Sequence, residues 1–127
     1  MMNIDINMDT VLEEILSLHD NLLALEDEDL SKMQGESVNT MLGLSSRLCV
    51  MWITADELER LSTKEKGLLR HDFMNKLHGV LGFTTLMLRE SLAPHIFERV
   101  QASKALSKTI EHNMTLLTKG YVPEVIE

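Results

Sequence analysis

The residues best suited to chemistry lie between Arg70 and His78, where the chain reads Arg-His-Asp-Phe-Met-Asn-Lys-Leu-His. On an α-helix, which turns about 100° per residue, His71, Asn75 and His78 fall within about 60° of one another. An imidazole can act as a nucleophile or move a proton, and an amide can orient a water molecule. The spacing therefore predicts one polar helical stripe that contains a nucleophile.

The apolar residues of the same segment fall on the opposite side of this helix. With His71 at zero, they lie between about 160° and 280°: Phe73, Leu77, Val80, Leu81, Thr84, Met87 and Leu88. A helix in a globular domain buries its apolar side. We therefore expect His71 and Asn75 to face solvent, within reach of a partner molecule.

The segment from His71 to His78, followed by Val80-Leu81-Gly82, resembles the phosphoacceptor box of two-component sensor histidine kinases. It is most similar to the citrate and dicarboxylate sensors and the related sporulation phosphotransferase, whose boxes read His, acid, aromatic, any residue, Asn, Lys, Leu. The resemblance covers about 20 residues strongly, as a short motif in which each position has a mechanical role. It extends more weakly over residues 63–119 as a helical hairpin, like a dimerisation and histidine-phosphotransfer domain.

The resemblance implies a role for each residue that matches the box. His71 would attack the phosphorus atom through one ring nitrogen, while Asp72 accepts a hydrogen bond from the other and fixes the tautomer. Asn75 matches a position that supports phosphatase activity, where an amide orients a water molecule. Arg70 and Lys76 would offset the charge of the phosphate or attract an acidic receiver surface.

Several of these residues also have an ordinary interpretation. Asn75, Arg70 and Lys76 can equally be solvated residues of a helix surface, and His78 is a further contact candidate because it shares the stripe. The other histidines, His19, His95 and His112, are interpreted as plain surface or hydrogen-bonded side chains.

The chain departs from the kinase pattern in ways that limit the expected activity. Only 56 residues follow His71, and there is no Asn-x-x-x-Asn box, no Asp-x-Gly-x-Gly and no Walker-type loop. The His-x-Leu-Lys-Gly signature of monomeric phosphotransfer domains is also absent, because Asn75 stands at the Gly position. We therefore expect no ATP-dependent autophosphorylation by this chain, and a phosphoryl group that comes from another protein.

Other chemistries have less support in the sequence. Neither Glu-x-x-His nor His-x-x-x-His occurs, so we expect no metal site on a helix. No Gly-x-Ser-x-Gly elbow is present. The resemblance implies no cofactor of the chain's own, since a receiver domain would supply both Mg²⁺ and a lysine.

Composition indicates a single all-α domain. The 127 residues are 44% hydrophobic, with nine Met, six Gly and two Pro, a mixture rich in helix formers and poor in turn residues. The net charge of −8 argues against nucleic acid or an anionic membrane as the main partner. The single Cys49, interpreted as core packing, and the lack of a signal or membrane segment predict a cytoplasmic protein.

Four helices are expected, after a short tail over 1–8. Asp9 or Thr10 would cap the first helix, the acidic run 26–29 would begin the second, and Ser62 with Glu65 would form a capping box for the third. Gly120 would cap the end of the fourth. The expected ranges are 11–25, 30–60, from 63 to before Pro94, and 95–119.

Each expected helix has an apolar face. The first uses Leu12, Ile15, Leu16, Leu22 and Leu23; the second uses Met41, Leu44, Leu48, Met51, Trp52 and Ala55; the fourth uses Ile96, Val100, Ala105 or Leu106, Ile110, Met114 and Leu117. Short connections between such helices favour an antiparallel four-helix bundle, in which the hairpin 63–119 joins two N-terminal helices. The bundle would close within one chain or through a homodimer, and the resemblance favours the homodimer.

Three functions remain open on this basis. The first is a histidine phosphotransfer protein that exchanges phosphate between His71 and a response-regulator receiver domain, and also acts as a receiver phosphatase through Asn75. The second is a binding module that docks on or inhibits a receiver domain or a histidine kinase. The third is a purely structural helical dimer.

Overall fold

The chain folds into an antiparallel bundle of four helices. The computed structural model describes residues 7–55 and 58–119. The helices are α1 (Met8–Glu26), α2 (Lys32–Thr54), α3 (Thr63–Leu88) and α4 (Pro94–Lys119), and the short 3₁₀ turn η1 (Leu58–Arg60) precedes α3. The described part of the chain contains no strand. The predicted all-α bundle is therefore confirmed.

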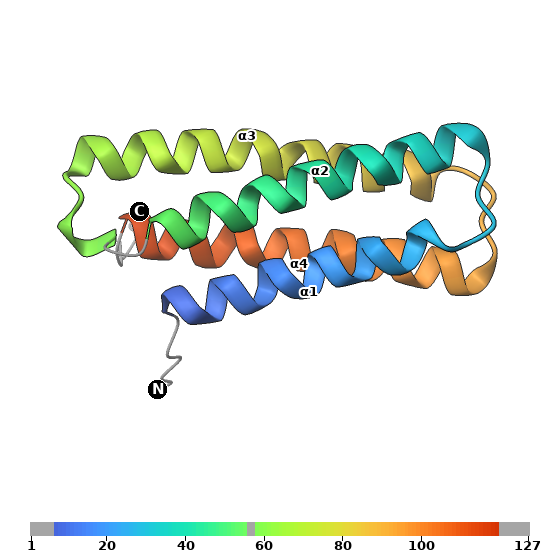
Figure 1. Cartoon of the computed structure of the whole chain (residues 1–127), viewed down its shortest axis with the longest axis horizontal. Helices are drawn as coiled ribbons and strands as arrows, with labels where there is room; N and C mark the ends of the chain where they lie inside the picture. The colour runs from blue at the N-terminus through green and yellow to red at the C-terminus, as the bar shows by residue number, and fades with distance from the viewer. Residues whose placement is uncertain (1–6, 56–57, 120–127) are drawn as a thin grey trace, which may run out of the picture.

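The bundle is closed by one copy of the chain. Helix α1 packs against α2 and α4, and α3 packs against the same two helices. The α1–α2 and α3–α4 loops lie at one end, and the α2–α3 connection lies at the other (Figure 1). A second chain is thus not needed to complete the four-helix core, and the homodimer stays a prediction.

Capping boxes set the beginnings of three helices. The predicted box of α3 is confirmed: Glu65 N donates to Ser62 Oγ at 3.0 Å, and Ser62 N donates to Glu65 Oε1 at 2.8 Å. Helix α1 begins earlier than predicted, because Asn7 rather than Asp9 or Thr10 is its N-cap. Met8 therefore belongs to α1 and not to a tail; residues 1–6 of the expected tail lie outside the described residues.

The second helix differs most from its predicted range. The acidic run 26–29 does not begin it: Glu26 ends α1, and residues 27–31 form the connecting loop. Ser31 caps α2 instead, in a reciprocal capping box with Gln34. This box gives two backbone N–H groups a hydrogen-bond acceptor, whereas carboxylates near a helix N-terminus stabilise it only through their charge. The helix ends at Thr54 rather than 60. The expected cap at Gly120 lies outside the described residues.

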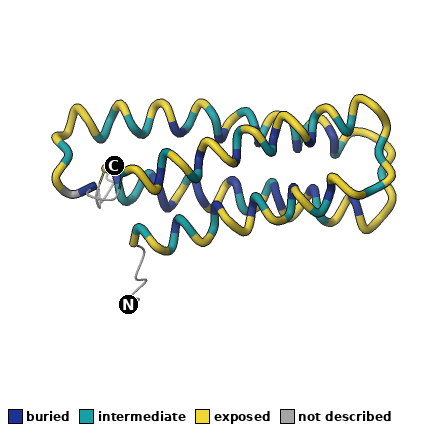
Figure 2. Tube along the Cα trace, viewed as in Figure 1, coloured by how far each residue is buried: buried dark blue, intermediate teal, exposed yellow. Residues whose placement is uncertain are grey.

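The core contains one apolar stripe from each helix (Figure 2). Trp52 and Phe73 meet edge to face with ring centroids 5.5 Å apart, and the indole Nε1 donates to the Met8 carbonyl at 2.9 Å. The buried apolar residues are Val11, Ile15, Leu18, Leu22, Leu25, Val38, Met41, Leu48, Trp52, Leu58, Phe73, Leu77, Val80, Met87, Ile96, Val100, Ile110 and Met114. Cys49 is half-buried and packs against this core, as predicted.

The predicted face of α1 is rotated relative to the observed one. Ile15 and Leu22 are buried as expected, but Leu16 and Leu23 are 45% and 42% exposed. Val11, Leu18 and Leu25 take their places in the core. Because α1 packs against both α2 and α4, its buried stripe is centred near Val11 and Leu22, about 90° around the helix from Leu12.

Helix α4 places small polar residues at the centre of the core. Ser103 and Ser107 are fully buried, and each hydroxyl donates to the backbone carbonyl four residues earlier, at 2.9 Å. These bonds satisfy the buried hydroxyls. Because the serine side chains are small, the neighbouring helices can approach α4 closely at these positions. Ala105 is correspondingly exposed, and Leu106 is only partly buried.

Candidate functional site

Helix α3 holds the His71 stripe on the outside of the bundle. His71, Asp72, Asn75, His78 and Gly82 are exposed. The buried residues of the helix are Phe73, Leu77, Val80, Thr84 and Met87. The predicted division of this helix into a core side and a solvent side is therefore confirmed, with Leu81 and Leu88 at the half-buried edges. We define the His71 stripe as His71, Asn75, His78 and Gly82.

The His71 imidazole is not engaged by the protein. Neither ring nitrogen forms a hydrogen bond or ion pair within the described part of the chain. The neighbouring Asp72 carboxylate instead lies 3.4 Å from Lys76 Nζ, an ion pair one turn along the helix. Consecutive residues on a helix point in directions about 100° apart, which favours this pairing over a contact with His71. The bond from His71 to Asp72 thus stays a prediction.

The two cations of the segment differ in their surroundings. Arg70 turns toward α4, where its Nη1 donates to Thr118 Oγ1 at 3.2 Å, so it links the helices of the hairpin. Lys76 is half-buried and its ammonium group is directed to Asp72. Lys76 therefore stays beside the stripe, whereas Arg70 lies at its α4 edge.

His78 has a partner that sequence reasoning missed. Its Nε2 lies 3.0 Å from Glu111 Oε2 on α4, and both side chains are partly exposed. A carboxylate on one ring nitrogen fixes the tautomer of a neutral histidine and leaves the other nitrogen free. The pairing depends on the alignment of α3 with α4, so no spacing within either helix alone could have revealed it.

Two exposed leucines flank the stripe. Leu68 and Leu86 are 61% and 54% exposed. Both lie about 60° from His71 around the helix, one turn before it and four turns after it. Between them a Cβ on Gly82 would have open space, because no atom lies within 4 Å of its position. The surface around His71 is therefore an open helical ridge with apolar contacts toward both ends.

The His71 stripe lies outside the two hollows described for the protein surface. They are lined by residues of α1, α2 and their connecting loop. Small-molecule sites are concave pockets, and the His71 stripe lines neither of these two. No group of three His, Cys, Asp or Glu side chains is placed to hold a metal ion among residues 7–55 and 58–119. Over the same residues, no helix is long and apolar enough to cross a membrane.

The protein is therefore a four-helix bundle that exposes the imidazole of His71 on α3. Comparison of the chain with protein-family models, with curated proteins and with solved structures gave no match. The assignment of a function therefore depends on the geometry of the site and on the resemblance of the His71 segment.

Proposed function

We propose that this protein is a histidine phosphotransfer protein that exchanges a phosphoryl group between His71 and the aspartate of a response-regulator receiver domain. The observation that carries the proposal is the free, exposed imidazole of His71 on an uncovered helix. The resemblance of residues 71–82 to a phosphoacceptor box supplies the reaction class. In the proposal the protein is cytoplasmic and has no cofactor of its own.

The transfer step uses the free ring nitrogen. In the proposed reaction, the imidazole nitrogen of His71 attacks the phosphorus of the receiver's aspartyl phosphate in line. The new N–P bond forms as the acyl O–P bond breaks, and the aspartate leaves as a carboxylate. The second ring nitrogen then releases its proton to solvent or to Asp72, if that side chain exchanges Lys76 for the ring. The receiver supplies Mg²⁺ for the charge on the phosphoryl oxygens.

Asn75 supports a second activity of the same surface. It is exposed one turn after His71, so its amide can reach a phosphoryl group bound there. In the proposal, this amide orients a water molecule for attack on the receiver's aspartyl phosphate, and the products are aspartate and inorganic phosphate. Lys76 would keep positive charge next to this group.

The test is transfer of ³²P from a phosphorylated receiver domain to the purified chain. We expect a label on wild type that is stable in base and labile in acid, as a phosphoramidate is. His71→Ala is expected to lose the label, and Asn75→Ala is expected to keep it while receiver dephosphorylation slows. His112→Ala is the matched control, because His112 is an exposed histidine on α4, outside the stripe.

Two results would remove the proposal. One is equal labelling of His71→Ala and wild type; if that label is lost in His78→Ala, the acceptor is His78. The other is that wild type and His71→Ala both bind a receiver domain or a histidine kinase, but neither protein becomes labelled and the lifetime of the receiver's phosphate does not change. The protein would then be a docking or inhibitory module. The proposal includes a homodimer only because residues 63–119 resemble a dimerisation and histidine-phosphotransfer domain. Light scattering tests this part by measuring the mass of the protein in solution.

A further inference from the structure

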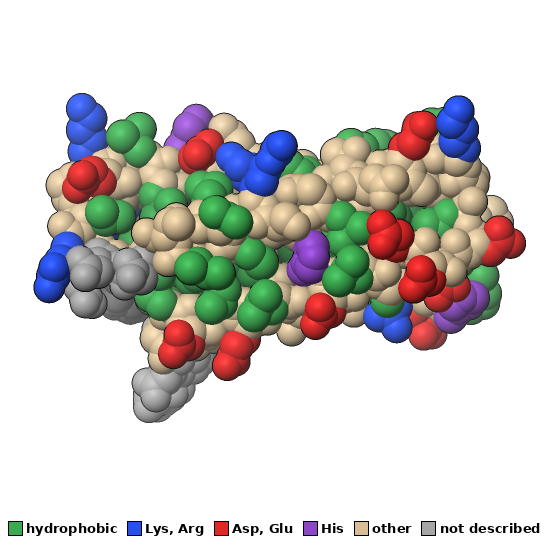
Figure 3. All heavy atoms as spheres, viewed as in Figure 1, with side chains coloured by type: hydrophobic (Ala, Val, Ile, Leu, Met, Phe, Trp, Pro, Cys, Tyr) green, Lys and Arg blue, Asp and Glu red, His purple; other side chains and the backbone are tan. Residues whose placement is uncertain are grey.

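The side of the bundle formed by α1 and α2 has an apolar surface of its own. Leu16 and Leu23 on α1 and Ile53 on α2 are exposed at 45%, 42% and 56%. Leu12, Leu16 and Leu23 fall within about 40° of one another around α1, so they form a single line. Figure 3 shows hydrophobic side chains gathered over α1 and α2 near the N-terminal end of α1.

Two contacts place this line at the border between α1 and α2. Leu12 and Ile53 line the same hollow, and His19 Nδ1 lies 2.6 Å from Ser45 Oγ farther along the pair. We use the name α1–α2 groove for the surface that combines this hollow at Leu12 and Ile53 with the exposed Leu16 and Leu23 on α1 and the half-buried Cys49 on α2.

Two separate hollows lie near the two ends of the α1–α2 pair. At one end, a hollow of about 320 Å³ is lined by Met8, Asp9, Leu12, Trp52 and Ile53. At the other end, a hollow of about 410 Å³ lies between the end of α1 and the beginning of α2, lined by residues that include Glu26, Leu30 and Val38. Such hollows can accept apolar side chains that project from a partner.

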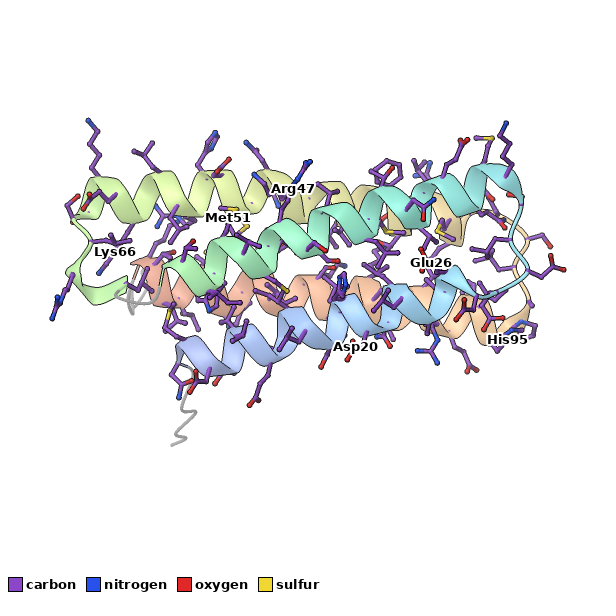
Figure 4. All side chains as sticks on the ribbon, in the orientation of Figure 1. Asp20, Glu26, Arg47, Met51, Lys66 and His95 are labelled. Atoms are coloured by element: carbon purple, nitrogen blue, oxygen red, sulfur yellow. The ribbon has the colours of Figure 1, made fainter. Side chains whose placement is uncertain are left out.

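The α1 border of the groove is acidic, whereas α2 carries the exposed Lys32, which lines the second hollow, and the exposed Arg47. Residues 1–31 contain nine of the 20 acidic residues of the chain and none of the 12 Lys and Arg. Four exposed carboxylates lie along α1, from Asp9 and Glu13 to Asp20 and Glu26, the last two labelled in Figure 4. The field along this helix therefore attracts cations, whereas residues 32–127 are close to neutral as a group.

We propose that the α1–α2 groove binds an amphipathic helix of a partner protein whose apolar stripe is flanked by Lys and Arg. An apolar groove between two helices is a common seat for such a helix. The acidic border gives the complementary charge, and the 19-residue length of α1 allows contact over about 28 Å. The groove lies apart from the His71 stripe, so the protein can hold this partner while α3 stays free.

A second copy of the chain is the weaker occupant. In a twofold-symmetric dimer each surface meets its own copy. The carboxylates of one α1 would then face those of the other, and like charges across an interface are unfavourable. Charge complementarity therefore favours a basic helix from a different protein.

The test uses a fluorescent synthetic peptide of about 18 residues, with Leu at helical spacing on one face and Lys and Arg on its flanks. We expect binding in fluorescence anisotropy that weakens with salt. Leu16→Ser combined with Ile53→Ser should raise the Kd at least about tenfold. The matched control combines Met33→Ser with Phe97→Ser, which removes two exposed apolar side chains elsewhere, and it should change the Kd by less than about twofold.

Two further measurements locate the binding and separate its causes. Bound peptide should slow alkylation of Cys49, the only cysteine, which is half-buried on α2 four residues before Ile53. Glu13→Gln combined with Asp20→Asn should weaken binding and flatten its salt dependence, because two carboxylates of the border are lost. Circular dichroism checks that each variant is folded, which is expected because every substituted side chain is exposed.

Several outcomes would overturn the proposal. These are no binding of the basic peptide, equal binding of a peptide with Glu flanks, or an unchanged Kd for Leu16→Ser with Ile53→Ser. A protein that is dimeric in light scattering and becomes monomeric through these two substitutions would also overturn it, since the groove would then hold a second copy.

Discussion

His78 and Glu111 connect α3 to α4 two turns from the histidine that carries the proposed reaction, with Nε2 and Oε2 3.0 Å apart. His78 lies two turns after His71, about 10 Å along the helix axis. A partner that covers His71 therefore also covers this pair. The pair adds a carboxylate from α4 to the charged residues that α3 presents around His71.

Breaking this pair should change the contact surface and not the fold. We expect Glu111→Gln to change unfolding free energy by less than about 1 kcal/mol, because the side chains are 55% and 38% exposed and such pairs contribute little. His78→Ala should leave ³²P labelling at His71 in place while changing the rate of transfer from the receiver. Urea unfolding and the labelling time course measure the two effects. Loss of all labelling in His78→Ala would contradict this prediction.

Truncation should cost much more stability on the buried side of α3 than on the exposed side. Phe73 is fully buried against Trp52, so Phe73→Ala should destabilise the protein by about 3–5 kcal/mol through lost burial and a cavity. His71→Ala removes an exposed side chain without a partner and should shift stability by less than about 0.5 kcal/mol. Urea midpoints compare the two variants. A large loss of stability in His71→Ala would mean that the imidazole has a structural role.

Two of the three glycines of α3, Gly79 and Gly82, provide a matched pair. A Cβ on Gly82 would meet no atom within 4 Å, so Gly82→Ala should stabilise the helix by about 0.5–1 kcal/mol. A Cβ on Gly79 would lie 2.8 Å from Leu44 Cδ1, and this side chain on α2 must move. Gly79→Ala should therefore gain less, or lose stability. Thermal unfolding of the two variants tests the order, and an equal gain for both would contradict it.

The α1–α4 contact should be sensitive to a single carboxylate. Asn113 is buried, and its Nδ2 lies 3.0 and 2.9 Å from the two oxygens of Glu14. Glu14→Ala would leave this amide without that acceptor, and we expect a cost of about 1–3 kcal/mol in unfolding free energy. Glu13→Ala is the control, because Glu13 is exposed on the same helix. Equal stability of the two variants would show that solvent replaces the acceptor.

The sequence was sufficient to predict the local features of α3. Its capping box and its division into core and solvent sides depend on residues within a few positions of one another, so local spacing contains the information. The start of α2 was predicted wrongly because two local signals competed. The acidic run favours a helix start through its charge, but the reciprocal hydrogen bonds of Ser31 and Gln34, which were not predicted from the sequence, begin α2 at Lys32.

Features that depend on alignment between helices could not be predicted in the same way. The contact of His78 with Glu111 and the closure of the bundle by α1 against α4 both require the relative position of two helices. The exposure of Leu16 and Leu23 has the same origin. A wide apolar arc on α1 does not indicate which part faces two neighbours and which part stays uncovered.

The thiol of Cys49 should show the pH dependence of a buried acid. Burial, and secondly the charge of Asp20, raise the pKa of Cys49 above its ordinary value of 9.0. Above that value the unfolded chain loses the thiol proton while the folded chain retains it. This contribution to stability is therefore complete at lower pH and is lost as the pH rises through the folded pKa.

Two measurements check the thiol. The pH midpoint of Cys49 alkylation should lie above 9.0 in the folded protein, return toward 9.0 in urea, and fall part of the way in Asp20→Asn, because burial remains. From neutral to alkaline pH, wild type should lose stability relative to Cys49→Ala, which removes this group while other titrations stay the same. A folded midpoint at or below 9.0 would mean that the thiol is more accessible to water than its half-buried position on α2 indicates.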